Sequence, residues 1–402
     1  MSAQVQLSIS EDVVREISAS LDEPEWMLQR RLDALETLPS LDLPDVIQTP
    51  GRRWTNLVDL DFEGLVDPLT WAEDKDQVGP DSVDVLPFSD ALDEHEELIR
   101  EHFGTVTEPD TNYLTALSTA LFSTGTVVYV PANVDAEDVT IRTRMNSRSL
   151  FNYTLVVTEQ SSSVTILERQ STGDEVDGDR YYSGLVEIVA GENSKVQYGN
   201  LQDLDENTYH YSLKKAETAQ YARINWVDCN IGSRLTKASV ETTLSGDGSE
   251  TKIVGAFFGH NEQHIDVSAR VWHRAEHTVA DLITRGVLDD HARSVYEGVQ
   301  HVGKEAWHTN SYQRENTLML SDESEADASP KLIINNHETE ASHSATVGQI
   351  DREDLFYMTS RGLSPKLAKN MLVEGFFVPV LEEIEVVELR DDLETQVLNR
   401  LK

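Results

Sequence analysis

The chain has 402 residues and a formal charge of -39, from 72 acidic against 33 basic residues. This excess excludes a nucleic-acid backbone or an anionic membrane as the partner, because no basic stripe offsets the repulsion. The acidic residues are spread along segments that keep their apolar periodicity, which indicates the surface of a folded protein from a high-salt cytosol. No run approaches the roughly 18 uncharged apolar residues of a membrane helix, and the first residues lack a secretion leader, so we expect a cytoplasmic protein.

The chain has a single cysteine, Cys229, in the segment NWVDCNIG. One thiol cannot form an intramolecular disulfide, nor can it build a closed multi-thiolate metal site within this chain. The β-branched surroundings predict a small thiol buried in a strand. Metal chemistry based on thiolates would therefore need a second chain.

Residues 1–125 are predicted to form a helical region with an irregular, proline-rich segment. Ser10 is expected to cap one helix, and Pro24 fits the first turn of a second. Between these helices and residue 87, repeated proline and glycine break any long element. Two further helices are expected before residue 125, the first capped by Ser89.

Residues 126–348 alternate apolar and polar side chains at period two. Runs such as YTLVVTE, SVTILER and TKIVGAFF are β-branched and are separated by Gly, Asn, Asp, Ser or Thr. Almost no helix-period segment intervenes, which disfavours a doubly wound α/β sheet. A sandwich, a barrel and a stacked solenoid remain open, and the number of strands and their irregular corners favour a β-helix.

Residues 349–402 return to the helical period of 3.6. Asp351 is expected to cap a helix that Gly362 ends. Pro365 opens a longer helix with a broad apolar face, which Pro379 is expected to kink. A last short amphipathic helix follows.

The twelve histidines are the obvious pool of metal ligands. His260 and His264 have helical ligand spacing, but their surroundings predict strand and turn, where they would be about 13 Å apart and unable to share an ion. His337 and His343, on one face of an extended strand, would be roughly 20 Å apart. A metal role for His343 therefore requires ligands from elsewhere, such as another chain, and a structural histidine is the plainer interpretation.

Asp281, Asp289, Asp290 and His291 could suggest the paired carboxylates of glycoside cleavage on neighbouring rungs of a β-helix. In a chain with 72 acidic residues such adjacency is expected by chance, so solvated turns are favoured. No Walker A sequence, no GxGxxG at a strand-to-helix turn and no GxSxG occurs. The residues themselves give no reason to assign an enzyme.

The run PKLIINNHETEASHSATVGQIDREDLFYMTSRGLSPKLAKNMLVEGFFVPVLEEI resembles the C-terminal signature of the SufB/SufD family, the scaffold subunits of the SUF iron-sulfur cluster assembly machine. That family ends in a P-x-L-x-I strand, an SHGAT-like turn, an LFYL-x-SRG helix and an A-x-x-x-L-x-x-x-F helix. The resemblance extends upstream through TRGVLDDHARSVYEGVQHV, the YVP strand and EPEWMLQRRLDALE. The C-terminal counterparts here are Pro330, Leu332 and Ile334; Ser342–Thr346; Leu355–Gly362; and Ala368, Leu372 and Phe376.

The resemblance implies a right-handed parallel β-helix core, residues 126–348, between an N-terminal helical region, 1–125, and a C-terminal helical domain, 349–402. It implies a non-enzymatic scaffold subunit that pairs with a SufB-type subunit. A B-type subunit should carry a cysteine near the end of the β-helix, and residues 300–350 contain none. The chain therefore resembles the D subunit, SufD.

In the D subunit the SH motif supplies a histidine thought to face the B subunit's cysteine where the nascent cluster forms. His343 matches that position, so the resemblance makes it the candidate ligand of a transient iron-sulfur cluster shared between the subunits. Two departures from the family pattern lie beside it. Ala341 stands where a cysteine is frequent, which implies either that this cysteine is dispensable or that ligation here relies more on the partner. Ser344 replaces a glycine, which alters how closely the turn approaches the partner backbone.

The resemblance also implies that the C-terminal helices dock the SufC-type ABC ATPase, so that ATP is bound only by that partner. Complexes of the family can associate with a reduced flavin, for which no motif here marks a site. Rival interpretations are a cytosolic homodimeric β-helix adaptor and a β-helix carbohydrate-active enzyme. Aromatic and arginine side chains dominate interface energetics, and the candidate anchors are Phe356, Tyr357, Arg361, Phe376 and Phe377.

Overall fold

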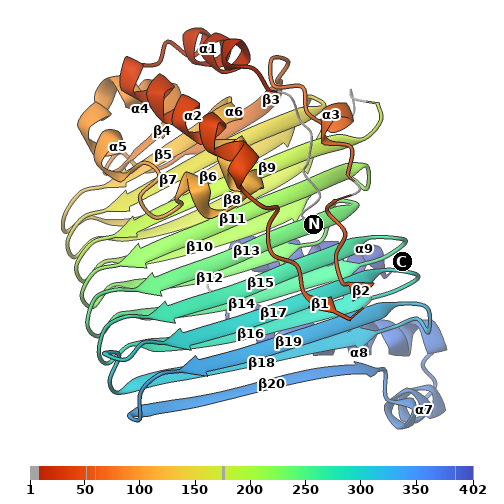
Figure 1. The fold of residues 1–402 in the computed structure, drawn as a ribbon. Helices are drawn as coiled ribbons and strands as arrows, with labels where there is room; N and C mark the ends of the chain where they lie inside the picture. Colours follow the sequence, from red (N-terminus) through yellow and green to blue (C-terminus); the bar gives the residue numbers. More distant parts are fainter. Residues whose placement is uncertain (1–8, 51, 59, 174–176, 385, 402) are drawn as a thin grey trace.

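A computed structural model describes residues 9–50, 52–58, 60–173, 177–384 and 386–401. Its centre is two nine-stranded sheets that face each other, and the chain alternates between them (Figure 1). Sheet I contains β3 (Glu73–Val78), β6 (Asp135–Met145), β8 (Ser163–Thr172), β10 (Lys195–Asp203), β12 (Arg223–Asn230), β14 (Glu250–Gly259), β16 (Val279–Leu288), β18 (Thr309–Met319) and β20 (Thr339–Gln349). Sheet II contains β4 (Asp84–Pro87), β5 (Thr124–Val130), β7 (Ser149–Thr158), β9 (Arg180–Ala190), β11 (Thr208–Thr218), β13 (Leu235–Leu244), β15 (His264–His273), β17 (Arg293–Val302) and β19 (Glu325–Ile334).

Each strand pairs in parallel with the strand two places along the chain, so the sequence winds as a parallel β-solenoid. The predicted parallel β-helix is therefore confirmed. Only β3 and β4, the first strand of each sheet, are antiparallel to their neighbours β6 and β5. The sequence analysis had left both strands inside the irregular segment, because each is short and close to proline.

One corner of the solenoid repeats from coil to coil. Asn193, Tyr221 and His277 each adopt a positive φ there. Their amide groups donate to the carbonyl groups of the next corner, from Asn193 to Gln220 at 2.8 Å and from Tyr221 to Asp247 at 2.9 Å. Asparagine and histidine are enriched in this left-handed conformation, but tyrosine adopts it rarely, so residue identity alone conceals the repeat.

The space between the sheets is filled by side chains that stack from rung to rung. On the inner face of sheet I, the parallel register places Tyr198 beside Trp226, and Trp226 beside Ile253. The rings of Tyr198 and Trp226 are 5.4 Å apart, and both are buried. Each buried aliphatic or aromatic side chain of such a stack stabilises the fold by about 1.5 to 3 kcal/mol. This continuous stack explains why two sheets with no intervening helix form one core.

The N-terminal helices cover the outer face of sheet II near its first strands. Arg31 lies buried at their centre, where it pairs with Glu23 and donates to the carbonyl groups of Ala120 and Phe122. The sequence analysis expected one helix after Ser89; instead the segment forms two short helices that break at His95. The bounds are α1 (Glu11–Ser20), α2 (Glu25–Thr37), α3 (Phe62–Leu65), α4 (Phe88–Glu94), α5 (Glu96–His102) and α6 (Tyr113–Leu121), with 3-10 turns at Leu38–Ser40 and Pro109–Thr111.

Residues 41–58, apart from 51, form a strap that runs along the outer face of sheet II from α2 to the last coils (Figure 1). It contains the small hairpin β1 (Gln48–Thr49) and β2 (Arg52–Arg53). Arg52 pairs with Glu325 and Asp327 of β19. The strap thus ties the N-terminal region to the last strand of sheet II.

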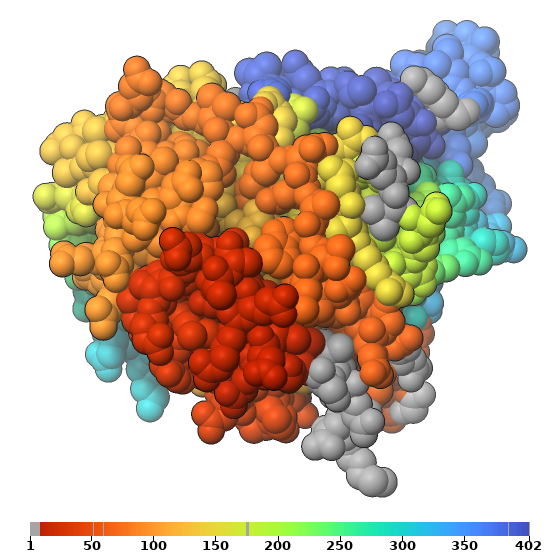
Figure 2. Space-filling model, turned by 90° about the horizontal axis from the view of Figure 1, so that it is seen from above, coloured from red at the N-terminus to blue at the C-terminus, as the bar shows by residue number. Residues whose placement is uncertain are grey.

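The C-terminal helices α7 (Arg352–Ser360), α8 (Pro365–Leu381) and α9 (Val387–Arg400) follow the last coil. Helices α8 and α9 pack on the outer face of sheet I, opposite the N-terminal helices (Figure 2). Pro379 lies inside α8, which continues to Leu381. No helix in the described part of the chain is long and apolar enough to cross a membrane.

Candidate functional site

The two ends of the solenoid differ, and the C-terminal end is open. Strands β19 and β20 each pair on one side only, with β17 and β18, within the residues described. Ile333, Ile334 and Val347 of these strands are exposed. An unprotected strand edge with apolar side chains is a template for pairing with another chain. The last coil is therefore the face of the solenoid best suited to association.

His343 lies on this open coil, in the middle of β20. It is exposed, and the register places it beside Gln313 of β18. Because Gln313 is buried between the sheets, strand alternation places His343 on the face of β20 that continues the interior. Within the described residues no group of three or more His, Cys, Asp and Glu side chains is placed to hold a metal ion. His343 can serve a metal only with further ligands.

The other candidate histidines have local partners or stand apart from His343. His337 precedes β20 in a turn, so the single extended strand assumed for residues 337–343 was wrong. His264 begins β15, and its Nε2 lies 3.0 Å from the Thr55 hydroxyl of the strap. His260 lies in the preceding turn, 3.3 Å from Glu206. The structure does not bring these histidines to the open coil.

The acidic group around Asp281 is likewise dispersed. Asp281 receives two hydrogen bonds of 2.9 Å from Arg314, which stands beside it on the outer face of sheet I. Asp289 pairs with Lys369 of α8 at 3.2 Å. Asp290 occupies a positive-φ corner, and His291 pairs with Glu323. These side chains hold turns and helices in place, and nothing in their arrangement favours glycoside cleavage.

Behind His343 the interior of the solenoid is polar. On β18, Ser311, Gln313, Glu315 and Thr317 alternate inward, and all four are buried. The Thr317 hydroxyl donates to Glu315 Oε1, and the Ser311 hydroxyl donates to Gln300 on the facing β17. The open coil therefore leads to hydrogen-bonding groups rather than to the apolar stack of the earlier coils. The cluster was not predicted from the sequence, because residues 309–319 are almost all polar and lack the apolar alternation of the other strands.

The predicted partner-binding residues on the C-terminal helices divide into two groups. Phe356 and Tyr357 of α7 are 73% and 59% exposed, and the Arg361 guanidinium lies 5.1 Å from the Tyr357 ring centroid. Phe376 is half-buried beneath Arg285, and Phe377 is 1% exposed in the core that joins α8 to sheet I. The structure leaves the first three exposed and packs the last two against sheet I.

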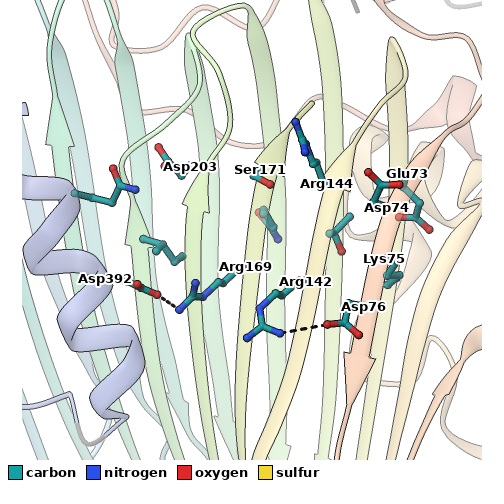
Figure 3. A pocket seen from close by; sticks show the side chains of 14 residues that line it. Glu73, Asp74, Lys75, Asp76, Arg142, Arg144, Arg169, Ser171, Asp203 and Asp392 are labelled. Carbon is teal, nitrogen blue, oxygen red and sulfur yellow. Dashed lines mark hydrogen bonds and ion pairs between the residues drawn. The ribbon is translucent and has the colours of Figure 1, made fainter. Parts of the chain in front are cut away.

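A groove of about 750 Å³ lies on the outer face of sheet I between β3 and α9 (Figure 3). Its floor carries Arg142 and Arg169, which are neighbours across β6 and β8. Both pair with Glu388 of α9, at 3.3 and 2.8 Å, and Arg169 also pairs with Asp392. The hydrogen bond from Arg169 lowers the pKa of the Glu388 carboxyl. These ion pairs attach α9 to the solenoid, so we interpret the groove as a helix-docking seam.

The fold thus defines the class of the chain: a two-sheet parallel β-solenoid with helices on both outer faces and an open last coil. A family model described as SUF system FeS cluster assembly, SufBD core domain, matches residues 140–376, and the SufBD protein N-terminal region matches residues 67–141. Proteins from Staphylococcus saprophyticus, Staphylococcus epidermidis and Staphylococcus aureus strain MRSA252 are 29%, 28% and 27% identical.

Each alignment covers 94% of this chain and 90% of the relative, and each relative is described as an iron-sulfur cluster assembly SufBD family protein. Because the core model spans more than half of the sequence, the chain belongs to the SufBD family of iron-sulfur cluster assembly proteins.

Proposed function

We propose that this chain is a D-type scaffold subunit of a cytosolic SUF complex, which pairs with a B-type subunit through the open coil. The observation that carries the proposal is His343, exposed on the last strand beside unpaired backbone. A partner strand placed against β20 would cover the exposed apolar residues of the coil and complete the ligand set around this imidazole. The nascent cluster would then form between the two chains.

The environment of Cys229 supports the D-type assignment. This thiol is fully buried between sheet I and the C-terminal helices. Burial raises the pKa of the Cys229 thiol above its usual range, so the thiolate that binds iron is disfavoured. Iron-sulfur clusters are held mainly by thiolates, which in this proposal come from the partner.

We propose that α7 and the exposed side of α8 dock the ABC-type ATPase. Phe356, Tyr357 and Arg361 lie on this surface, and Leu367 and Met371 of α8 are also exposed. Exposed aromatic and apolar side chains beside an arginine are typical of interface anchors. ATP binding belongs to the ATPase, and we assign no residue of this chain to a reduced flavin.

The test is co-expression of this chain with B-type and ATPase homologues, purification through this chain in molar KCl, and native mass determination. We expect one B-type subunit and two ATPases with the wild type. His343→Ala should keep the assembly and lose the cluster absorbance, whereas His337→Ala, which removes an exposed imidazole just before the same strand, should keep both. A wild type that emerges alone or as a homodimer contradicts the proposal.

The docking surface is tested in the same preparation. Phe356→Ala combined with Tyr357→Ala should lose the ATPase and retain the B-type subunit, because α7 has no buried residues and contributes little to the core. Val387→Ala, at an exposed apolar position of α9, is the matched control. Loss of the B-type subunit in the double variant would show that α7 does not serve the ATPase.

We further propose that the acidic surface adapts the protein to concentrated salt. With a formal charge of -39, like charges repel strongly once the screening length grows on dilution of salt. The melting temperature should therefore fall between molar and millimolar KCl. An unchanged melting temperature would rule out this interpretation of the charge.

A further inference from the structure

Four glutamates in the described part of the chain are buried, and they are not equivalent. Glu187 accepts hydrogen bonds from the backbone of Gly104, Val106 and Thr107 and from the Tyr153 hydroxyl. Glu168 accepts hydrogen bonds from Tyr198 and Gln170, and Glu241 accepts one from Ser239 and forms an ion pair with Arg270 at 3.8 Å. Glu315 has only the Thr317 hydroxyl on one oxygen. Its other oxygen, Oε2, is buried without a partner.

Gln313, the next inward residue on the same strand, is also unsatisfied. It is 2% exposed, and neither its amide oxygen nor its amide nitrogen has a hydrogen-bond partner. A buried polar group without a partner costs roughly 1 to 3 kcal/mol. The other three buried glutamates have polar partners, so Glu315 and Gln313, two residues apart on one strand, are candidate ligand groups.

A glycine on the facing strand makes room for the Gln313 amide. Gly298 of β17 faces Gln313 across the interior, and a Cβ added there would lie 2.7 Å from the Gln313 amide oxygen and 2.8 Å from the Tyr296 hydroxyl. Any larger residue would displace both polar atoms. On the side of the open coil, the parallel register places Ala345 beside Glu315. A glycine therefore borders the Gln313 amide, and an alanine stands beside Glu315 on the open side.

The distance from Glu315 to His343 suits a shared ligand. The register pairs Gln313 with His343, so Glu315 lies one strand away and two residues along. Strand spacing and residue rise place the two Cα atoms about 8 Å apart on one face. Both side chains point to the same interior space, and each reaches part of the way towards its centre.

We propose that Glu315 and His343 bind one divalent transition-metal ion of the ferrous type at the open coil, with the Gln313 amide oxygen as a further ligand. One imidazole, one carboxylate and one amide oxygen form a nitrogen and oxygen set that suits Fe²⁺ and leaves coordination positions free. The partner subunit would fill those positions. This inference rests on the proposed function and deepens it, because it adds two ligands from inside the solenoid to the single histidine of the surface.

The test uses the purified full-length chain and Co²⁺ as a probe for Fe²⁺, because its d–d absorption reports imidazole and carboxylate ligation. The titration is performed in molar KCl, which screens the acidic surface. We expect one equivalent to bind to the wild type, and Glu315→Gln and His343→Ala each to weaken binding by about tenfold or more. Glu340→Gln, which removes an outward carboxylate from the same strand as His343, should bind Co²⁺ like the wild type.

Three results would overturn the inference: no Co²⁺ absorption in the wild type, unchanged affinity in Glu315→Gln, or an equal loss in Glu340→Gln. Glu315→Gln keeps the size of the side chain and its contact with Thr317, so folding is retained, and a melting curve verifies this. Failure of partner co-purification would contradict the proposed function and leave the Co²⁺ titration interpretable. Conversely, unchanged Co²⁺ affinity in Glu315→Gln would leave the assembly result standing.

Discussion

The N-terminal end of the solenoid, which we call the closed end, and the open C-terminal end each bury a glutamate. The two glutamates differ in how many hydrogen-bond donors they have. At the closed end, near the N-terminal helices, Glu187 has four donors. At the open end, Glu315 has one. Both side chains are at most 1% exposed. The two carboxylates are equally buried, so burial alone does not distinguish them; the number of oxygen atoms with a hydrogen-bond partner does.

The two ends also differ in how their strands terminate. The closed end is capped by the antiparallel strands β3 and β4 and by helices, and its aromatic side chains, such as Phe88, Phe103 and Phe122, pack edge to face. The open end has no comparable cap among the described residues, and Ile333 and Ile334 are exposed there. A fold that protects one end so completely leaves the other available for a partner.

The largest effect is expected at the closed end. Glu187→Gln replaces two acceptor oxygens with one and turns an amide towards the backbone donors of Val106 and Thr107. We expect the free energy of unfolding to fall by about 3 kcal/mol. Guanidinium unfolding in molar KCl measures it, and Glu192→Gln, on an exposed corner, serves as the control. A loss as small as that of the control would show that the four donors do not stabilise the closed end.

At the open end, the Glu-to-Gln substitution should raise the free energy of unfolding instead of lowering it. Burial raises the folded-state pKa of Glu315 to about 7, above the value of about 4.5 of a solvated glutamate. Between these values the unfolded state releases the proton first, so wild-type stability falls as pH rises through that window. Glu315→Gln lacks this loss and should be more stable at pH 8 by up to about 3 kcal/mol, with no gain below the window. Denaturation in the presence of a chelator, at pH 4 and pH 8, measures it; destabilisation at pH 8 would contradict it.

The contrast between Glu187 and Glu315 marks the limit of sequence reasoning. The solenoid was predictable, because period two persisted over residues 126–348 without helices and the C-terminal motifs resembled a β-helix family. Strands β3 and β4 were missed, because they are short and their sheet partners are distant in sequence. The candidate site was predicted only in part: His343 was predicted from the resemblance. Glu315 and Gln313 were not, because alternation places them inside but cannot reveal which buried polar atoms lack partners.

The buried histidine beneath the strap predicts that stability depends on pH below about 6.5. His264 lies beneath the strap beside Thr55, and burial lowers its pKa to about 4. The unfolded chain binds this proton near pH 6.5, so stability is present above that pH and falls as pH decreases towards 4, by about 2 to 3 kcal/mol. His264→Asn should reduce the slope of unfolding free energy against pH in this range. It should not abolish the slope, because burial also lowers the pKa of His210 to about 3 and of His273 to about 4. His277→Asn, on an exposed corner, should leave the slope unchanged.

The smallest effect concerns the contact between the strap and the open coil. Arg52 is half-exposed, and its pairs with Glu325 and Asp327 lie at the surface, where such pairs contribute little to global stability. Arg52→Ala should therefore leave the melting temperature unchanged while hydrogen exchange quickens in the hairpin β1–β2 and the outer residues of β19. Arg53→Ala, at the neighbouring exposed position, is the matched control.

If hydrogen exchange quickens in the hairpin alone, the strap packs on the solenoid but does not stabilise β19. If β19 responds as well, the N-terminal region helps to hold the edge strand in the extended form that a partner must meet. The closed end would then contribute to the shape of the open end through one surface arginine.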